Sequence, residues 1–153
     1  MSTVKPVPDG FHTVTPYLMV EDAAAALDFY ERGLGATEVQ CHKTGDRVIH
    51  VQFKIGDSII MMGENRDLEP RSEKGYPRVS VYLYVDDADA LTERAVAAGG
   101  KLIMPVRDEF YGDRIGGVQD PWGMAWWIAT HKEDLSGEEL ARRAKEAYAK
   151  RGA

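Results

Sequence analysis

The chain has 153 residues and a mass of 17.0 kDa, the size of one compact domain that buries roughly 70% of its unfolded surface. Its formal charge of −6 and pI near 5.2 disfavour a nucleic-acid partner, because phosphate binding needs a surplus of Lys and Arg. One cysteine, Cys41, excludes an internal disulfide and a four-cysteine zinc module. No apolar run approaches the ~20 residues of a membrane span, and no apolar signal region opens the chain. We therefore expect a cytoplasmic protein with no membrane partner.

The first half of the chain predicts one helix among four strands. After an irregular arm rich in Pro and Gly, the β-rich run 14–20 predicts a strand. Apolar residues at helical spacing predict a helix over 22–32, which Gly33 and Gly35 close. Three strands are expected next, the last two joined by a tight hairpin at Gly56-Asp57: 36–41, 48–55 and 58–62.

The second half repeats this order. Residues 64–78 are polar, contain two prolines and have no apolar period, which predicts a linker. A strand over 79–85 and a helix over 87–98 follow, and then three strands near 102–104, 114–118 and 124–130. The expected organisation is one structural domain in five parts: an arm (1–12), a first module (13–63), a linker (64–78), a second module (79–131) and a C-terminal helix (132–153).

The two modules also match in sequence. YLMVEDA at 17–23 aligns with YLYVDDA at 82–88, an offset of 65 (82 − 17), and the same offset places Gly35 on Gly100. Two copies are too few for a solenoid, so a paired-module fold is favoured. The alternative is a chance similarity between two helices that begin with acidic caps.

A third helix is expected over 136–151, outside the repeat. Ser136 and Glu139 have the spacing of a capping box. The apolar stripe of this helix is thin, so its charges form either a solvated face or a surface that docks across a dimer.

The strand–acidic–Ala-rich helix–FY–Gly pattern resembles a known family. VEDAAAALDFYERGLGA resembles the first module of the vicinal oxygen chelate superfamily of glyoxalases, bleomycin-resistance proteins, fosfomycin-modifying enzymes and extradiol dioxygenases. FYGDRIGGVQDPWGMAWWIATHKEDLSGEEL is similar to its PhnB-like, glyoxalase-like branch. The resemblance covers about residues 12–135 and continues into the tail helix. It implies an α+β fold of two βαβββ modules, which form paired half-barrels around a ligand cavity, plus a C-terminal helix. It also implies a homodimer.

Metal-dependent members of that superfamily hold an ion at the first and last strand of each module. The resemblance places these positions at Thr15, Met62, Ser80 and Trp127. None is a usual ligand for a divalent metal, which prefers imidazole, carboxylate or thiolate donors. Of the four histidines, His42 and His50 are expected to meet across a hairpin, which supplies two donors, with Asp46 as the candidate for a third. We therefore expect no metal and no cofactor.

Strand alternation predicts the cavity lining, an aromatic and thioether surface with a few hydroxyls. Trp122, on the Asp120-Pro121-Trp122-Gly123 turn, covers either a cavity rim or a subunit contact. Arg114 is the cationic candidate at the cavity mouth, or an ordinary ion-pair partner. The expected ligand-binding residues are Thr15, Tyr17, Ile60, Met62, Ser80, Tyr82, Trp122, Trp127 and Arg114. The alternative is that the aromatic residues fill the half-barrels as core.

No catalytic residue is assigned. Acid–base chemistry would have to use Tyr17, Tyr82, Glu64 or Asp108, none with a sequence neighbour that plainly tunes its pKa. Gly112, Gly116 and Gly117 are expected to be turn and bulge glycines. The favoured function is a metal-free, antibiotic-resistance type of protein that binds or sequesters a hydrophobic or aromatic small molecule. The alternative is a glyoxalase-like lyase or isomerase, with an unusual metal site or acid–base chemistry alone.

Overall fold

The computed structural model describes residues 4, 7–66 and 80–151. The predicted linker over 64–78 therefore lies outside the described residues from residue 67 onward. The chain divides into two compact units, residues 1–74 and 75–153.

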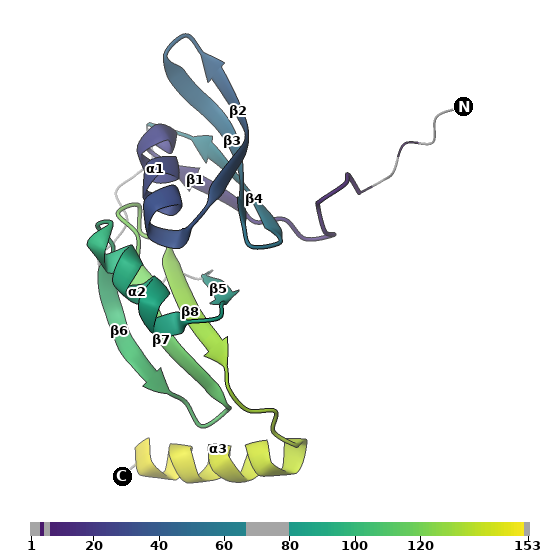
Figure 1. The fold of residues 1–153 in the computed structure, drawn as a ribbon, viewed down its shortest axis with the longest axis vertical. Coiled ribbons are helices and arrows are strands. Elements are labelled where there is room, and N and C mark those ends of the chain that lie inside the picture. Colours follow the sequence, from purple (N-terminus) through teal and green to yellow (C-terminus); the bar gives the residue numbers. More distant parts are fainter. Residues whose placement is uncertain (1–3, 5–6, 67–79, 152–153) are drawn as a thin grey trace. The chain divides into compact units, whose positions relative to one another are not determined.

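The first unit is a four-stranded sheet covered on one face by a helix (Figure 1). The strand order is β1-β4-β3-β2, with β1 parallel to β4 and the other pairs antiparallel. Two-residue turns join β2 to β3 and β3 to β4, and Gly45 and Gly56 supply the positive φ that such turns require. The elements are β1 (Tyr17–Val20), α1 (Ala23–Leu34), β2 (Thr37–Thr44), β3 (Arg47–Ile55) and β4 (Ser58–Glu64).

The second unit repeats the topology and adds a helix. Its sheet order is β5-β8-β7-β6, with β5 parallel to β8. The elements are β5 (Val81–Tyr84), α2 (Ala88–Ala97), β6 (Lys101–Asp108), β7 (Asp113–Gln119), β8 (Ala125–His131) and α3 (Gly137–Arg151). The predicted α+β fold of two βαβββ modules with a C-terminal helix is confirmed.

Each covering helix begins in the same way. The Asp22 and Asp87 side chains accept from the backbone N–H three residues on, at 3.0 Å in both cases. The residue directly after each cap donates its N–H to a side chain at the end of the last strand of the unit. Ala23 donates to Glu64 at 3.0 Å, and Ala88 donates to Thr130 at 2.8 Å. The repeated acidic residue therefore fixes each helix start, and the last strand fixes where that start lies.

Strand register corrects one predicted face. Tyr17 pairs with Met61, whereas Tyr82 pairs with Trp127, so the offset at the last strands is 66 (127 − 61) and not 65. Met62 is therefore beside Leu18 on the helix-covered face, where it and Ile60 are buried. The prediction that these two residues share the face of Tyr17 was wrong. The extra residue is in the turn after β7, which has three residues (121–123) between the bonded Asp120 and Met124, whereas the turn after β3 has two (56–57) between the paired Ile55 and Ser58.

That longer turn is organised by Asp120, which is 4% exposed. One carboxylate oxygen accepts from the backbone N–H groups of Trp122 and Met124 at 3.0 and 2.9 Å, and the other accepts from Trp126 Nε1 at 3.0 Å. The Asp-Pro-Trp-Gly sequence is therefore a turn tied to a fully buried tryptophan of the core.

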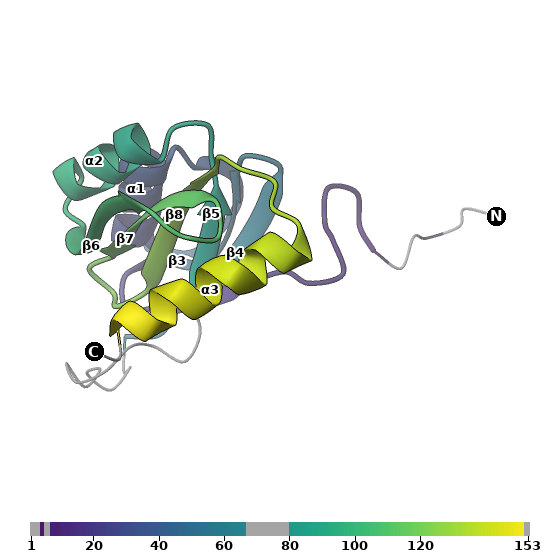
Figure 2. The same ribbon diagram turned by 90° about the horizontal axis from the view of Figure 1, so that it is seen from below.

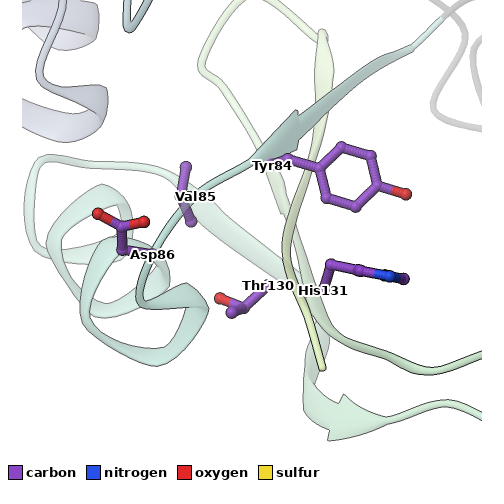
Figure 3. Close-up of a pocket in the computed structure, with 5 residues that line it drawn as sticks. All are labelled: Tyr84, Val85, Asp86, Thr130 and His131. Carbon is purple, nitrogen blue, oxygen red and sulfur yellow. The ribbon is translucent and has the colours of Figure 1, made fainter. Parts of the chain in front are cut away.

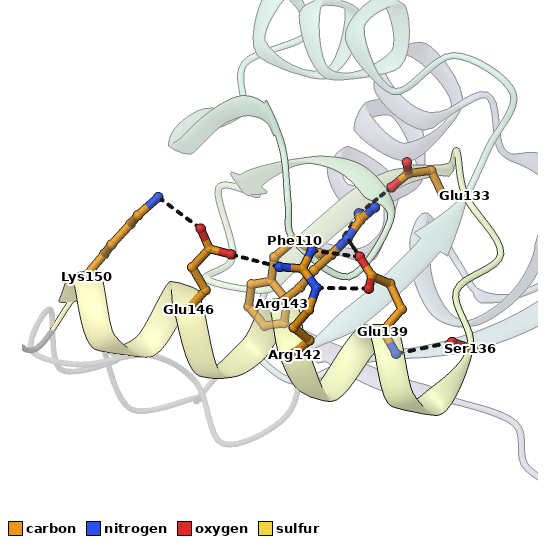
Figure 4. Close-up of polar contacts among 8 residues, drawn as sticks. All are labelled: Phe110, Glu133, Ser136, Glu139, Arg142, Arg143, Glu146 and Lys150. Atoms are coloured by element: carbon orange, nitrogen blue, oxygen red, sulfur yellow. Dashed lines mark hydrogen bonds and ion pairs between the residues drawn. The ribbon is translucent and has the colours of Figure 1, made fainter.

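Helix α3 lies across the end of the second unit at which β6 ends and β7 begins (Figures 1 and 2). Ser136 Oγ accepts from the Glu139 N–H at 3.1 Å, as the predicted cap requires. The Glu139 carboxylate forms ion pairs with Arg142 and Arg143 (Figure 4). Arg143 also contacts Glu133 at 2.7 Å and the Phe110 carbonyl at 3.4 Å, which holds the helix to the β6–β7 turn. No helix among the described residues is long and apolar enough to span a bilayer.

We predict that Asp120→Asn destabilises the chain by about 2 kcal/mol, because the amide NH₂ would face the Trp126 N–H, leaving two donors opposed in a buried site. Urea denaturation measures the change, and Asp57→Asn, in the exposed β3–β4 turn, is the matched control. Equal stability of the two variants would contradict this account of the turn.

Candidate functional site

On the open face of the second sheet, the face away from α2, the side chain of Trp127 contacts the backbone of β7. Trp127 lies over Gly117, where a Cβ atom would be 2.5 Å from Cζ3 and 2.8 Å from Cε3 of the indole. Its Nε1 donates to Ser80 Oγ at 3.1 Å. Gly116 and Gly117 lie within β7, so the prediction of turn residues was wrong for these two, but the register against β6 does shift beside them, between Met104 and Arg107. The absence of a side chain at Gly117 makes room for the indole.

Two tyrosines extend this face along β5. Tyr82 pairs with Trp127 in register, and Tyr82 and Tyr84 have ring centroids 5.1 Å apart. Their exposed fractions are 41% and 65%, high for aromatic side chains on a sheet. Both hydroxyls donate to Asp113 Oδ2, at 2.8 and 3.0 Å. The rings therefore present apolar surface while their polar ends are held.

Asp113 is the centre of a polar cluster at the end of this face. Its side chain is only 4% exposed, and its second oxygen, Oδ1, is 2.8 Å from His131 Nδ1. His131 Nε2 is 2.8 Å from Asp134, whose side chain is fully exposed. Tyr84 and His131 also line a cavity of about 590 Å³, and their side chains point to the same side of the strands (Figure 3).

The hydrogen bonds of this cluster set its charges. Burial raises the pKa of Asp113, but hydrogen bonds from His131, Tyr82 and Tyr84 outweigh burial and hold the pKa below its ordinary value. The contact with Asp113, and then that with Asp134, raises the pKa of His131. Burial, followed by the bond to Asp113, raises the pKa of both Tyr82 and Tyr84. The tyrosines are therefore neutral donors to an ionised carboxylate.

Tyr82 was among the predicted site residues, but Asp113 and His131 were missed in the sequence. His131 shares the alternation of Trp127, but its position at a strand end, before a charged run, hides its role. Asp113 looks like a partner for the adjacent Arg114, and only the register, in which Asp113 pairs with His131, places it on the open face. Strand alternation along β8 was the one available signal.

Arg114 lies on the opposite, helix-covered face. It pairs with Thr130 in register and binds Asp89 of α2 through two bonds of 2.7 and 2.9 Å, with Asp108 at 3.2 Å. The hydrogen bonds that this guanidinium donates to Asp89, and then to Asp108, raise its pKa. The ion-pair alternative is therefore the right one, and Arg114 is not a cation of the open face.

The open face of the first unit is simpler. Tyr17 is half exposed, its hydroxyl is 3.2 Å from His50 Nδ1, and its ring lies against Gly63. His42 and His50 pair across the β2–β3 hairpin as predicted, with ring centroids 6.0 Å apart. Thr15 is half-buried just before β1. In the second unit, Trp122 is half-buried on the Asp120 turn.

The positions that hold a metal in some superfamily members do not fit one in this chain. Ser80 Oγ is occupied by the indole N–H of Trp127, and neither an indole nor a thioether such as Met61 or Met62 is a strong donor to a divalent ion. Among the described residues, no three His, Cys, Asp or Glu side chains converge on a common point.

Comparison with known proteins agrees with this fold. The family model of the Glyoxalase/Bleomycin resistance protein/Dioxygenase superfamily matches residues 10–128. The chain belongs to this superfamily. It is 31% identical to the uncharacterized protein Mb0911c of Mycobacterium bovis, over 83% of this chain and 88% of that protein. The anthracycline biosynthesis protein DnrV of Streptomyces peucetius is 29% identical over 78% of this chain but only 46% of its own length. The crystal structure of TioX from Micromonospora sp. ML1 superposes with a TM-score of 0.64 at 23% identity, covering 82% of this chain and all of TioX.

We predict that stability depends on pH through Asp113 and His131. The lowered pKa of Asp113 stabilises the fold above its ordinary value of 3.8, and this contribution is lost as pH falls through the folded pKa. The raised pKa of His131 stabilises the fold below its ordinary value of 6.5, and this contribution is lost as pH rises through the folded pKa.

Urea midpoints should therefore be highest between about pH 4 and 6.5 and should fall above that window. His131→Gln should remove the fall on the alkaline side, whereas His42→Gln, on the exposed hairpin, should retain it. Identical alkaline profiles for the wild type and His131→Gln would contradict the prediction.

Proposed function

We propose that this superfamily member is a small-molecule-binding protein of the sequestering, drug-resistance type. Its ligand is hydrophobic or aromatic and lies on the open face of the second sheet. The observation that carries the proposal is the placement of Trp127, whose indole lies against Gly117 and donates its N–H to Ser80. An indole held in this way offers a rigid face for stacking at little cost in side-chain entropy.

The rest of the face suits such a ligand. Tyr82 and Tyr84 add exposed aromatic surface, and an apolar surface with a few fixed polar groups is typical of small-molecule sites. The ends of Tyr84 and His131 stand beside the 590 Å³ cavity, where they can orient a polar substituent of the ligand. Similarity to a protein of anthracycline biosynthesis supports a planar polycyclic aromatic as the first ligand to test.

A proton-transfer enzyme is the second candidate. A buried carboxylate, Asp113, holds Nδ1 of His131, and Nε2 is 2.8 Å from the fully exposed Asp134. This arrangement orients an imidazole for general acid–base catalysis. It supports an enzyme of the lyase or isomerase type that would act on a ligand already bound at Trp127.

We predict that Trp127→Ala weakens binding of the anthracycline doxorubicin at least fivefold, because it removes a stacking interaction of about 1 kcal/mol. Isothermal titration measures the affinity, and denaturation of the same variant measures the stability. Tyr148→Ala, an exposed aromatic on α3, is the control and should bind like the wild type.

Unchanged affinity with a loss of about 3–5 kcal/mol of stability would make Trp127 a packing residue and contradict the proposal. Failure of the wild-type chain to bind doxorubicin would contradict it for planar polycyclic ligands. Mass spectrometry of the recovered doxorubicin should find it unaltered; a changed mass would favour the enzyme.

We also propose that the chain works as a cytoplasmic homodimer. The strands β1, β2, β5 and β6 are at the edges of their sheets, and such edges can be covered by a second copy. Light scattering at micromolar concentrations should give about twice the chain mass of 17.0 kDa. A mass near that of one chain throughout this range would contradict it.

A further inference from the structure

The β2–β3 hairpin of the first unit places two histidines opposite each other. His42 and His50 pair directly in register, and their ring centroids are 6.0 Å apart. Residues directly opposite on antiparallel strands have their side chains on one face of the sheet. His50 is on the face away from α1, because its Nδ1 is 3.2 Å from the hydroxyl of the half-exposed Tyr17. Both imidazoles therefore lie on the open face of this unit.

The separation of the two rings suits one shared metal ion. A metal–imidazole bond is about 2.0–2.1 Å long, which puts the ion about 3 Å from the ring centroid. Two imidazoles on one ion therefore have centroids at most about 6 Å apart, and the pair meets that limit. His42 is exposed and makes no hydrogen bond or ion pair with another described residue, so its ring can turn toward the ion.

Tyr17 holds the other imidazole in a suitable orientation. The strand order β1-β4-β3-β2 puts Tyr17 and His42 on opposite sides of His50. A Cβ at Gly63 would be 2.7 Å from the Tyr17 hydroxyl, so the glycine lets this tyrosine reach across β4. A proton on Nδ1 of His50, donated to Tyr17, leaves the lone pair on Nε2. Metal-bound imidazoles are held in this way, by a hydrogen bond at the nitrogen that does not bind the ion.

The surroundings of the pair favour a cation. The next residue pair on this face is Gln40 and Gln52, so neither an ammonium nor a guanidinium group stands beside the imidazoles there. The chain as a whole has a formal charge of −6, which attracts cations to its surface.

The number of donors narrows the choice of metal. Within the described ranges, no third His, Cys, Asp or Glu joins the two histidines. Zn²⁺ sites have three or four protein ligands. Cu²⁺ binds nitrogen donors more tightly than the other divalent ions of its series, and it accepts a tetragonal set of nitrogen and oxygen ligands. Two imidazoles and water molecules can supply such a set.

We propose that His42 and His50 form a Cu²⁺ site on the β2–β3 hairpin, with Tyr17 as a positioning residue. The two ligands come from the second and third strands of the unit, so the site is distinct from the positions that hold a metal in other superfamily members. It goes beyond the function proposed for Trp127 and does not depend on it.

The test begins with the chain freed of metals by EDTA and returned to neutral buffer. Isothermal titration should show one Cu²⁺ bound per chain, more tightly than Ni²⁺ or Zn²⁺. Pulsed EPR, which counts the imidazoles on Cu²⁺, should find two. Paramagnetic Cu²⁺ at a small fraction of one equivalent should broaden the amide NMR resonances of Cys41 and Val51, which adjoin the two ligands in sequence.

Variants at all four histidines locate the site. His42→Gln and His50→Gln should each weaken Cu²⁺ binding roughly tenfold or more and leave one imidazole in the EPR spectrum. His12→Gln and His131→Gln should bind like the wild type. Tyr17→Phe should weaken binding about tenfold while EPR still counts two imidazoles. Urea midpoints measured without metal show that each variant is folded.

Three results would overturn the proposed site: no heat of Cu²⁺ binding, a single imidazole in the wild-type EPR spectrum, or a loss of binding in His12→Gln or His131→Gln in place of His42→Gln. An unchanged affinity in Tyr17→Phe would overturn the positioning role. Trp127→Ala should leave the Cu²⁺ affinity unchanged, so this site and the proposed aromatic site can fail independently.

Discussion

Two adjacent glycines in β7 determine what can lie on either side of the second sheet. A Cβ at Gly117 would be 2.5 Å from the Trp127 indole, and a Cβ at Gly116 would be 2.7 Å from Val106 and 3.1 Å from the Thr92 hydroxyl. One glycine therefore permits the Trp127 indole to lie against the strand, and the other permits Thr92 of α2 to approach it. Since neighbouring residues of a strand point to opposite faces, a side chain at either position would displace one feature and not the other. The aromatic surface of the open face and the close approach of α2 to the sheet are thus independent consequences of one short sequence.

The two units show how a repeated sequence can preserve architecture while its interior changes. The parts that fix the architecture are shared: an acidic N-cap, a bond from the next N–H to the last strand, and the strand order. The parts that fill the interior are not, since Tyr30 and Phe53 correspond to Ala95 and Val118. Caps and ladders stabilise the backbone largely without regard to the core side chains, so the second unit keeps its topology although it has lost a stacked aromatic pair.

The sequence was sufficient for the fold, because helix caps, hairpin turns and the internal repeat are local signals. Both helix starts and the hairpin at Gly56-Asp57 lie where they were expected. It was insufficient for the open face, because a single extra residue in the turn at Asp120 changes the offset from 65 to 66, and side chains alternate with a period of two. Because of that one-residue difference, Ile60 and Met62 were predicted on the wrong face, whereas Tyr82 and Trp127 do pair side by side and Ser80 bonds to Trp127. The role of Asp113 depends on pairing between strands that are distant in sequence, which no local pattern reports.

The open face also constrains the size of the ligand proposed for it. Trp127 and His131 lie on the same face of β8 and are four residues apart, which is about 13 Å along a strand. Stacking on the indole supplies affinity, whereas the cluster around Asp113 supplies hydrogen-bonding groups at the far end. A single aromatic ring can use only one of these. A ligand that uses both must be an extended polycycle or carry its polar substituent on an arm of comparable length, so small carbonyl compounds are poor candidates for this face.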